Sequence, residues 1–146
     1  MLTDDVKGRV EAVVPELASR VQEAAELSEL VRKGQLPQSP AAGFVLPLGL
    51  RAASPGDAAA NAFTQMIEEV VGVLLVVRSA GDASGGRALP KISDLADATI
   101  AAIAGWGPAD EPGVFRVSRG QLLSASDGAV LYQLDFSISR QVRVLT

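Results

Sequence analysis

Neither histidine nor cysteine occurs among the 146 residues of this chain. Histidine is the only side chain whose unperturbed pKa lies near neutral pH, and it is the commonest metal ligand in proteins. Cysteine supplies redox chemistry, soft-metal ligands and reactive thiols. Their absence argues against a metalloenzyme, a histidine-dependent hydrolase and thiol catalysis. Carboxylate or lysine catalysis, a binding module and a subunit of an assembly remain. We favour the assembly subunit, with no metal and no cofactor.

Long apolar runs and aromatic residues are scarce as well. The longest apolar run, from Val70 to Val77, is too short to cross a membrane as a helix. The N-terminus lacks the basic and apolar segments of a signal peptide, so we expect no membrane partner. Aromatic residues make up 4% of the chain, and 13 Lys and Arg stand against 17 Asp and Glu. This acidic balance, without interleaved basic and aromatic residues, gives no reason to expect tight nucleic-acid binding.

The residues that are present favour a single folded domain over residues 1–146, because a hydrophobic fraction of 48% excludes global disorder. Apolar periodicity predicts helices near 3–14, within 19–33 and over 92–103. Alternation and β-branched residues predict strands over 44–51, 63–78, 114–123 and 132–143. The predicted fold class is therefore α+β, a mostly antiparallel sheet of about four strands with two to three helices packed on one face. Two stretches of small residues, near 52–62 and 79–89, are predicted to be mobile loops.

Local signals refine these elements. Pro47 lies inside a predicted strand, which places that strand at a sheet edge or at a bulge. Pro90 near the start and Gly105 just past the end bracket the third helix, the asymmetry that helices favour. A hairpin signal at 126–128 precedes the last strand. That strand alternates apolar and polar residues, so one of its faces should lie in the core and the other in water or an interface.

Three local patterns follow one another along the chain. Pro40–Gly49 opens the edge strand after the N-terminal helix, and a long strand ending in Val76-Val77-Arg78 leads through a glycine-rich loop to a helix that closes with Gly105-Trp106-x-Pro108. Gly120-Gln121-Leu122-Leu123 then precedes the last hairpin. In this order the patterns resemble the tail terminator, or tail-completion, proteins of long-tailed bacteriophages, over nearly the whole chain.

The resemblance implies a structural role without catalytic residues. Such proteins resemble small α+β subunits that assemble as a homo-hexameric ring on the last ring of the tail tube protein. The ring stops tube polymerisation and presents a surface to head-completion or connector proteins, while DNA only passes through the lumen. The implied location is the head-proximal end of the virion tail, and the host cytoplasm during assembly. The alternatives are another tail-tube or head–tail joining protein, and a small ligand-binding or enzymatic α+β domain.

Basic residues gather in the C-terminal third, where four arginines stand against Asp127 and Asp135. The arginines are Arg116, Arg119, Arg140 and Arg143. One interpretation is ordinary strand-surface charge. The other is a subunit or partner interface, in which these arginines pair with acids of a neighbouring copy. Candidate acids are Glu68, Glu69, Asp94 and Asp97.

Three further features have simpler explanations than catalysis or ligand binding. Adjacent strand residues point to opposite faces, so Glu68 and Glu69 are poorly placed as a general acid–base pair. The stretch Gly81–Gly86 lacks the spacing and the lysine of a phosphate-binding loop. Trp106 beside a helix C-terminus is either a core anchor or a contact to a partner, since tryptophan is enriched in interface hot spots.

Overall fold

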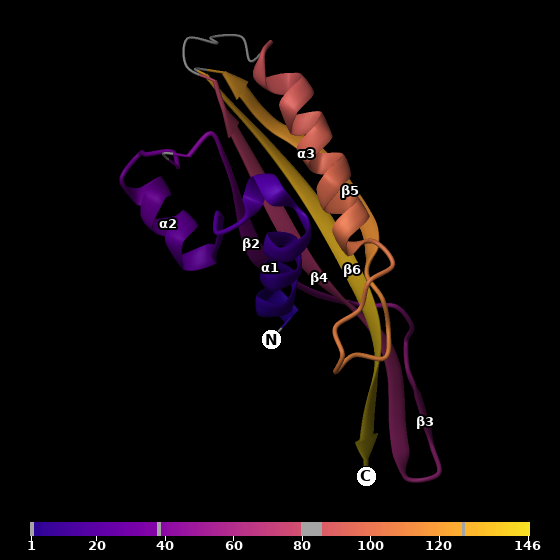
Figure 1. The fold of residues 1–146 in the computed structure, drawn as a ribbon. Helices are drawn as coiled ribbons and strands as arrows, with labels where there is room; N and C mark the ends of the chain where they lie inside the picture. The colour runs from indigo at the N-terminus through magenta and orange to yellow at the C-terminus, as the bar shows by residue number, and fades with distance from the viewer. Residues whose placement is uncertain (1, 38, 80–85, 127) are drawn as a thin grey trace.

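The computed structural model describes residues 2–37, 39–79, 86–126 and 128–146 (Figure 1). Its elements are α1 (Leu2–Val13), a 3₁₀ turn (Pro15–Leu17), β1 (Val21–Glu23), α2 (Ala24–Arg32), β2 (Ala41–Ala52), β3 (Asp57–Ala59), β4 (Ala62–Arg78), α3 (Ala88–Ile103), β5 (Arg116–Ser126) and β6 (Ala129–Leu145). The α+β class and the seven predicted helices and strands are confirmed, with shifted ends. Two strands, β1 and β3, come in addition.

The sheet has six strands in the order β1-β2-β4-β6-β5, and β3 pairs with β4 beyond the end of β2. Only the β1–β2 pair is parallel. β4 and β6 have 17 residues each and pair along their whole length, from Ala62 opposite Leu145 to Arg78 opposite Ala129. The predicted sheet of about four strands was too small, because β1 and β3 have three residues each. Three residues are too few for alternation to reveal a strand.

Pro47 lies where the sequence indicated, at an edge and at a bulge. The pairing of β2 with β4 shifts its register between Pro47 and Gly49. On its other side β2 pairs with β1 only over Gly43–Val45. Pro47 therefore has no strand beside it on that side, so its missing N–H leaves no sheet hydrogen bond unmade.

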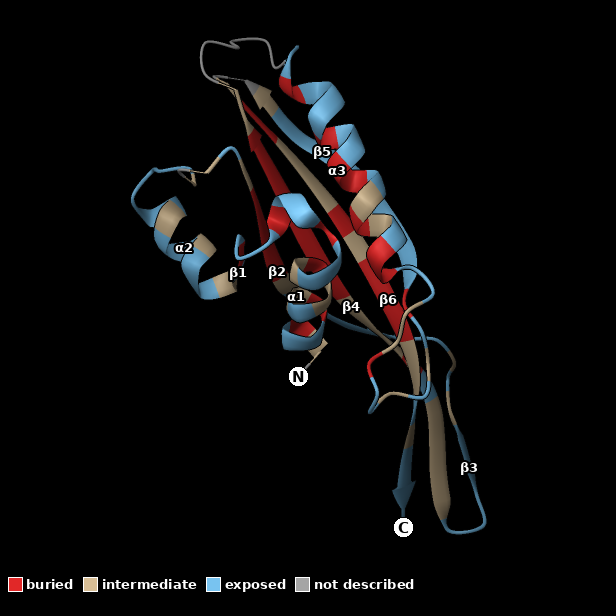
Figure 2. Cartoon of the chain, viewed as in Figure 1, coloured by how far each residue is buried: buried red, intermediate tan, exposed pale blue. Residues whose placement is uncertain are grey.

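Two helices, α1 and α3, pack on one face of the sheet, which we call the α1/α3 face. Their inward side chains join β4 and β6 in the main core, which contains 21 buried residues. Among these, Val6 and Val10 come from α1, and Ile92, Leu95 and Ile103 come from α3. The sheet contributes Val71, Val73, Leu75, Val130, Leu134, Phe136 and Ile138 among others. Figure 2 shows these buried segments beneath the two helices.

The third helix packs on the opposite face, which we call the α2 face. Leu27 and Leu30 of α2 contact a second cluster that contains Phe44, Leu74 and Val76. The expectation that all helices share one face is therefore wrong for α2. The reason lies in the continuous apolar run of β4, because successive residues point to opposite faces and both faces then need a cover.

One end of the sheet extends past the helices (Figures 1 and 2). This arm comprises β3, residues 62–66 of β4 and residues 140–145 of β6, none of which is buried. Its hairpin turns at Ala60 and Asn61, both with positive φ, 49° and 63°. The predicted loop near 52–62 thus contains a strand and a tight turn. Much of the predicted loop near 79–89, including most of Gly81–Gly86, lies outside the described residues, and the mobility of both remains a prediction.

Candidate interaction surface

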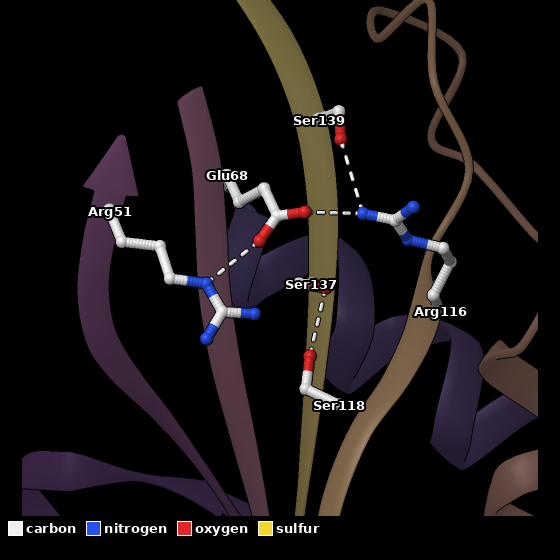
Figure 3. Close-up of polar contacts among 6 residues, drawn as sticks. All are labelled: Arg51, Glu68, Arg116, Ser118, Ser137 and Ser139. Carbon is white, nitrogen blue, oxygen red and sulfur yellow. Dashed lines mark hydrogen bonds and ion pairs between the residues drawn. The ribbon is translucent and has the colours of Figure 1, made fainter. Parts of the chain in front are cut away.

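Glu68 is held between two arginines on the α2 face (Figure 3). Arg51 of β2 donates from Nε to Glu68 Oε2 over 2.7 Å, and Arg116 of β5 donates from Nη2 to the other carboxylate oxygen, Oε1. Arg116 also reaches Ser139 Oγ, at 3.4 Å. The three charged side chains therefore tie together β2, β4 and β5, across the intervening β6.

The charge of Glu68 depends on these partners. The hydrogen bond from Arg51 is the main cause that holds the pKa of Glu68 below its usual value, and the charges of Arg51 and Arg116 lower this pKa further. Partial burial acts in the opposite direction, since only 15% of the Glu68 side chain is exposed. Glu68 is therefore a negative charge that is compensated within its own chain.

Glu69 points to the other face, as expected from its adjacent position. It accepts a hydrogen bond from Nε of Arg140, at 2.6 Å. Two of the four sequence-predicted arginines, Arg116 and Arg140, thus pair with the two sequence-predicted glutamates inside one chain. This pairing agrees with ordinary strand-surface charge for those two arginines. Within the described residues Arg119 and Arg143 form no ion pair, so they remain the candidates for a contact to another molecule.

Apolar side chains are exposed along the outer edge of β5. This strand ends the sheet, and residues 116–124 are all exposed. Val117, Leu122 and Leu123 are 42%, 46% and 48% exposed. β5 pairs regularly with β6 between two bulges, one between Val117 and Arg119 and the other between Leu122 and Ser124. Unpaired N–H and C=O groups beside apolar side chains form a template for another chain.

A second apolar edge lies on the opposite side of the sheet, along β2. Residues 47–52 are exposed, and Leu50 is 61% exposed. Beside them is an open hollow of about 260 Å³. Its lining residues are Leu2, Thr3, Pro47, Gly49, Leu50, Glu69, Val70 and Val71. Pro47 predicted that this strand lies at an edge or a bulge, but the exposure of its leucines was not predicted. Simple alternation puts Leu48 and Leu50 on the same side as Phe44, whereas the bulge after Pro47 changes the register.

Trp106 packs as an anchor of the core. Its ring stacks on Phe115 with the centroids 6.0 Å apart and the planes at 16°. The Arg9 guanidinium lies 5.4 Å from the ring centroid and donates from Nε to the Ala102 carbonyl oxygen at 2.9 Å. The indole is partly buried against the main core. These contacts favour the core-anchor interpretation over a partner contact.

The remaining hollows are shallow and do not gather a catalytic set. One, of about 240 Å³, is lined mainly by apolar surface, with Arg78 and Lys91 opposite Glu16 and Asp94. The Arg78 guanidinium is already held by the Pro37 carbonyl oxygen, at 2.8 Å. No cluster of three potential metal ligands occurs in the described part of the chain. No described helix is long and apolar enough to span a membrane.

Comparison with protein families gives one match. The family model described as phage tail terminator protein matches residues 2–144. This match spans nearly the whole chain and confirms the resemblance carried by the order of the sequence patterns. A comparison with curated proteins gave no match.

Proposed function

Since the chain belongs to the phage tail terminator family and is therefore a structural protein of a bacteriophage tail, we propose that it caps the tail tube as a ring. In this proposal identical subunits, six to a ring, sit on the head-proximal end of the tube. One side of the ring contacts the tube protein, and the other side contacts a head-completion or connector protein. DNA passes through the lumen without being bound specifically.

The observation that carries the proposal is where the exposed apolar side chains lie. Eight of the thirteen exposed large apolar side chains among the described residues lie along the two outer edges of the sheet or on the arm, where Met66, Val144 and Leu145 are exposed. Exposed strand edges accept other chains, and exposed apolar residues gain free energy when a partner covers them. A subunit of a closed assembly needs such surfaces on several sides. A ligand-binding domain would instead bring polar groups together in a cavity.

Capping in this proposal is a matter of geometry. A tube grows because each ring offers the next ring the same surface that it used itself. A terminator offers its tube-facing surface once, and its opposite surface has a different shape and charge. Further tube subunits then find no complementary site. No step requires proton transfer or a bound cofactor.

Polymerisation of the tail tube protein in the presence of this chain tests the proposal. We expect elongation to stop, and electron microscopy to show an additional ring at one end of each tube. A variant with a disrupted core, Phe136→Asp, is the control, because Phe136 is fully buried and the unfolded chain cannot cap. Tubes that elongate equally with and without the wild-type protein, and that carry no extra ring, would contradict the proposal.

The same preparation separates the alternatives within the virion. A tube protein would itself polymerise into long tubes or enter them along their length. A joining protein would bind the connector but leave tube growth unchanged. The terminator is distinguished by stopping growth from one end.

A further inference from the structure

We infer that neighbouring copies in the ring meet through two unlike sheet edges, the β5 edge of one copy against the β1–β2 edge of the next. This inference rests on the proposed ring, and it names the surface that closes it. The occupant of each edge is thus a second copy of this chain. The contact continues the sheet from one subunit to the next.

The register of the sheet places matching residues at the two edges. One straight row runs from Gln22 on β1 through Phe44, Leu74 and Gln133 to Gln121 on β5. In the inferred contact the edge strands run along the ring axis, and rotation about this axis moves each copy without a rise, so the two edges meet at equal height. Gln121 of one copy then lies beside Gln22 of the next. Both residues are exposed.

The apolar parts of the edges match at the same heights. Val117 of β5 lies in the row that ends at Pro47 of β2, through Phe136 and Val71. Pro47 lines the 260 Å³ hollow at the β2 edge. The exposed Val117 side chain of one copy therefore lies at the height of this hollow in the next copy. Burying apolar surface at such a contact favours association.

The two edges differ in the charge that remains after pairing within the chain. The β1 side, residues 2–33, contains seven acidic and five basic residues, and Arg32 and Lys33 pair with Glu29. Of the four arginines in 116–146, Arg116 and Arg140 pair with Glu68 and Glu69, so Arg119 and Arg143 carry the charge that no described ion pair compensates. The pKa of Glu23 is raised, first by a hydrogen bond to Asp4 and then by the charges of Asp4 and Glu26. A raised carboxylate pKa marks excess negative charge at this edge.

Arg119 supplies the complementary charge one row away from Glu23, since its own row runs through Asp135 and Gly72 to Leu46. It precedes Gly120, whose row ends at Glu23 through Leu134, Val73 and Val45. The register also places Arg119 and α2, which carries Glu26, on the same face of the sheet. Arg51 at the receiving edge does not oppose this contact, because Glu68 of its own chain compensates it.

Two unlike edges have a specific consequence for assembly. A contact between like edges pairs two copies and stops, whereas a contact between unlike edges leaves a free edge at each end. Head-to-tail contacts of this kind generate closed rings when the rotation closes. The sheet edges therefore fit a ring and not an isolated dimer.

Disulfide trapping tests the contact directly, since the chain has no cysteine of its own. Gln22→Cys and Gln121→Cys variants are mixed and oxidised, with and without tail tube protein. We expect a disulfide-linked dimer that contains one chain of each variant, formed on the order of tenfold faster than by Ser93→Cys, an exposed control on α3. A single chain that carries both substitutions should give a ladder of covalent oligomers.

The register is tested by moving one cysteine along the strand. Because of the bulge, Val117 lies three register rows from Gln121, opposite Phe136 and not Gln133, which is about 10 Å along the sheet, and a disulfide requires Cα atoms within about 7 Å. It should therefore not link to Gln22→Cys. Equal linking at both heights, efficient self-linking of Gln121→Cys, or no linking above the Ser93→Cys control would each overturn the inference.

Charge reversal at Arg119 provides a second test of the contact, both with the free protein and with tubes. Arg119→Glu should abolish trapping between the two edges, and Arg119→Lys should retain it because the charge is kept. Equal trapping in both variants would remove Arg119 from the contact. Failure of the inference is distinguishable from failure of the proposed function. If the wild-type protein caps tubes but the cysteine variants do not cross-link, the proposed ring stands and the edge contact is wrong. If the variants cross-link but the protein does not cap tubes, the edge contact stands and the proposed terminator function is wrong.

Discussion

Glu68 of β4 connects β2 and β5 to its own strand through a single carboxylate, and its ionisation should therefore affect stability. Its pKa is lower in the folded chain than its usual value of 4.5. A lowered folded-state pKa contributes stability above the unfolded-state pKa, and this contribution is lost as the pH falls through the folded-state pKa. We expect Glu68→Gln to lower the free energy of unfolding at pH 7, and the difference from wild type to shrink below about pH 4.5.

Urea unfolding at several pH values measures this difference. Glu11→Gln, at a half-exposed position on α1, is the matched control and should show no such convergence. A gap between wild type and Glu68→Gln that stays constant down to pH 2 would contradict the assignment.

Ala60 is a second residue with a measurable cost. Its φ of 49° is unfavourable for an alanine, and the hairpin turn between β3 and β4 needs positive φ at both central positions. Asparagine adopts this conformation more readily. Ala60→Asn should stabilise the hairpin by about 0.5–1 kcal/mol. Slower amide hydrogen exchange at residues 62–64 would reveal it, while Ala58→Asn, within β3, should accelerate the same exchange.

At the scale of elements, α2 is attached to the sheet by few contacts. None of its residues is fully buried, and Leu27 and Leu30 make its contacts with the second cluster. Leu30→Ala should therefore weaken the docking of α2 by about 1 kcal/mol. Hydrogen exchange should rise within Ala24–Arg32 and stay unchanged in α3. The exposed Val31→Ala variant should leave both helices as in wild type, and equal effects of the two substitutions would contradict this account.

The elements also separate what local sequence predicts from what it does not. The long strand β4 was predicted from its β-branched residues and continuous apolar run, and the helix α3 from apolar residues at helical spacing over many residues. β1 lay hidden in a predicted helical segment, because its three residues show no period. The face of the sheet that α2 covers depends on the order of the strands. That order is set by the whole sheet and not by the local sequence.

The candidate surface was predictable only in part, for the same reason. The four arginines and two glutamates were visible in the sequence, but Glu68 contacts Arg51 and Arg116 only because β2, β4 and β5 lie in one register. The apolar edges became visible only once β5 was known to end the sheet. Arg119 and Arg143 stand out after Arg116 and Arg140 have found partners within the chain, which composition alone does not reveal.

For the whole molecule, the arm is separable from the core. It lies outside the helical layers, and its residues contribute none of the buried core. A chain ending at Gln141 should keep its cooperative thermal unfolding, because the main core remains complete. It should lose tube capping if the arm contacts the tube or the connector. Calorimetry and the tube-length assay measure the two effects, and undiminished capping would exclude the arm from these contacts.

The position of β6 in the sheet also determines when the protein can fold. β6 is the last strand to be synthesised, yet it lies between β4 and β5 and pairs with both. Pairing of residues far apart in the chain slows folding, because the entropy of closing a long loop is lost before the favourable contacts form. Before β6 emerges from the ribosome, the apolar strand β4 has no partner on one side and β5 has none at all. We therefore expect the sheet to close only once β6 has emerged from the ribosome, so that each copy completes its sheet before its edges are available to another.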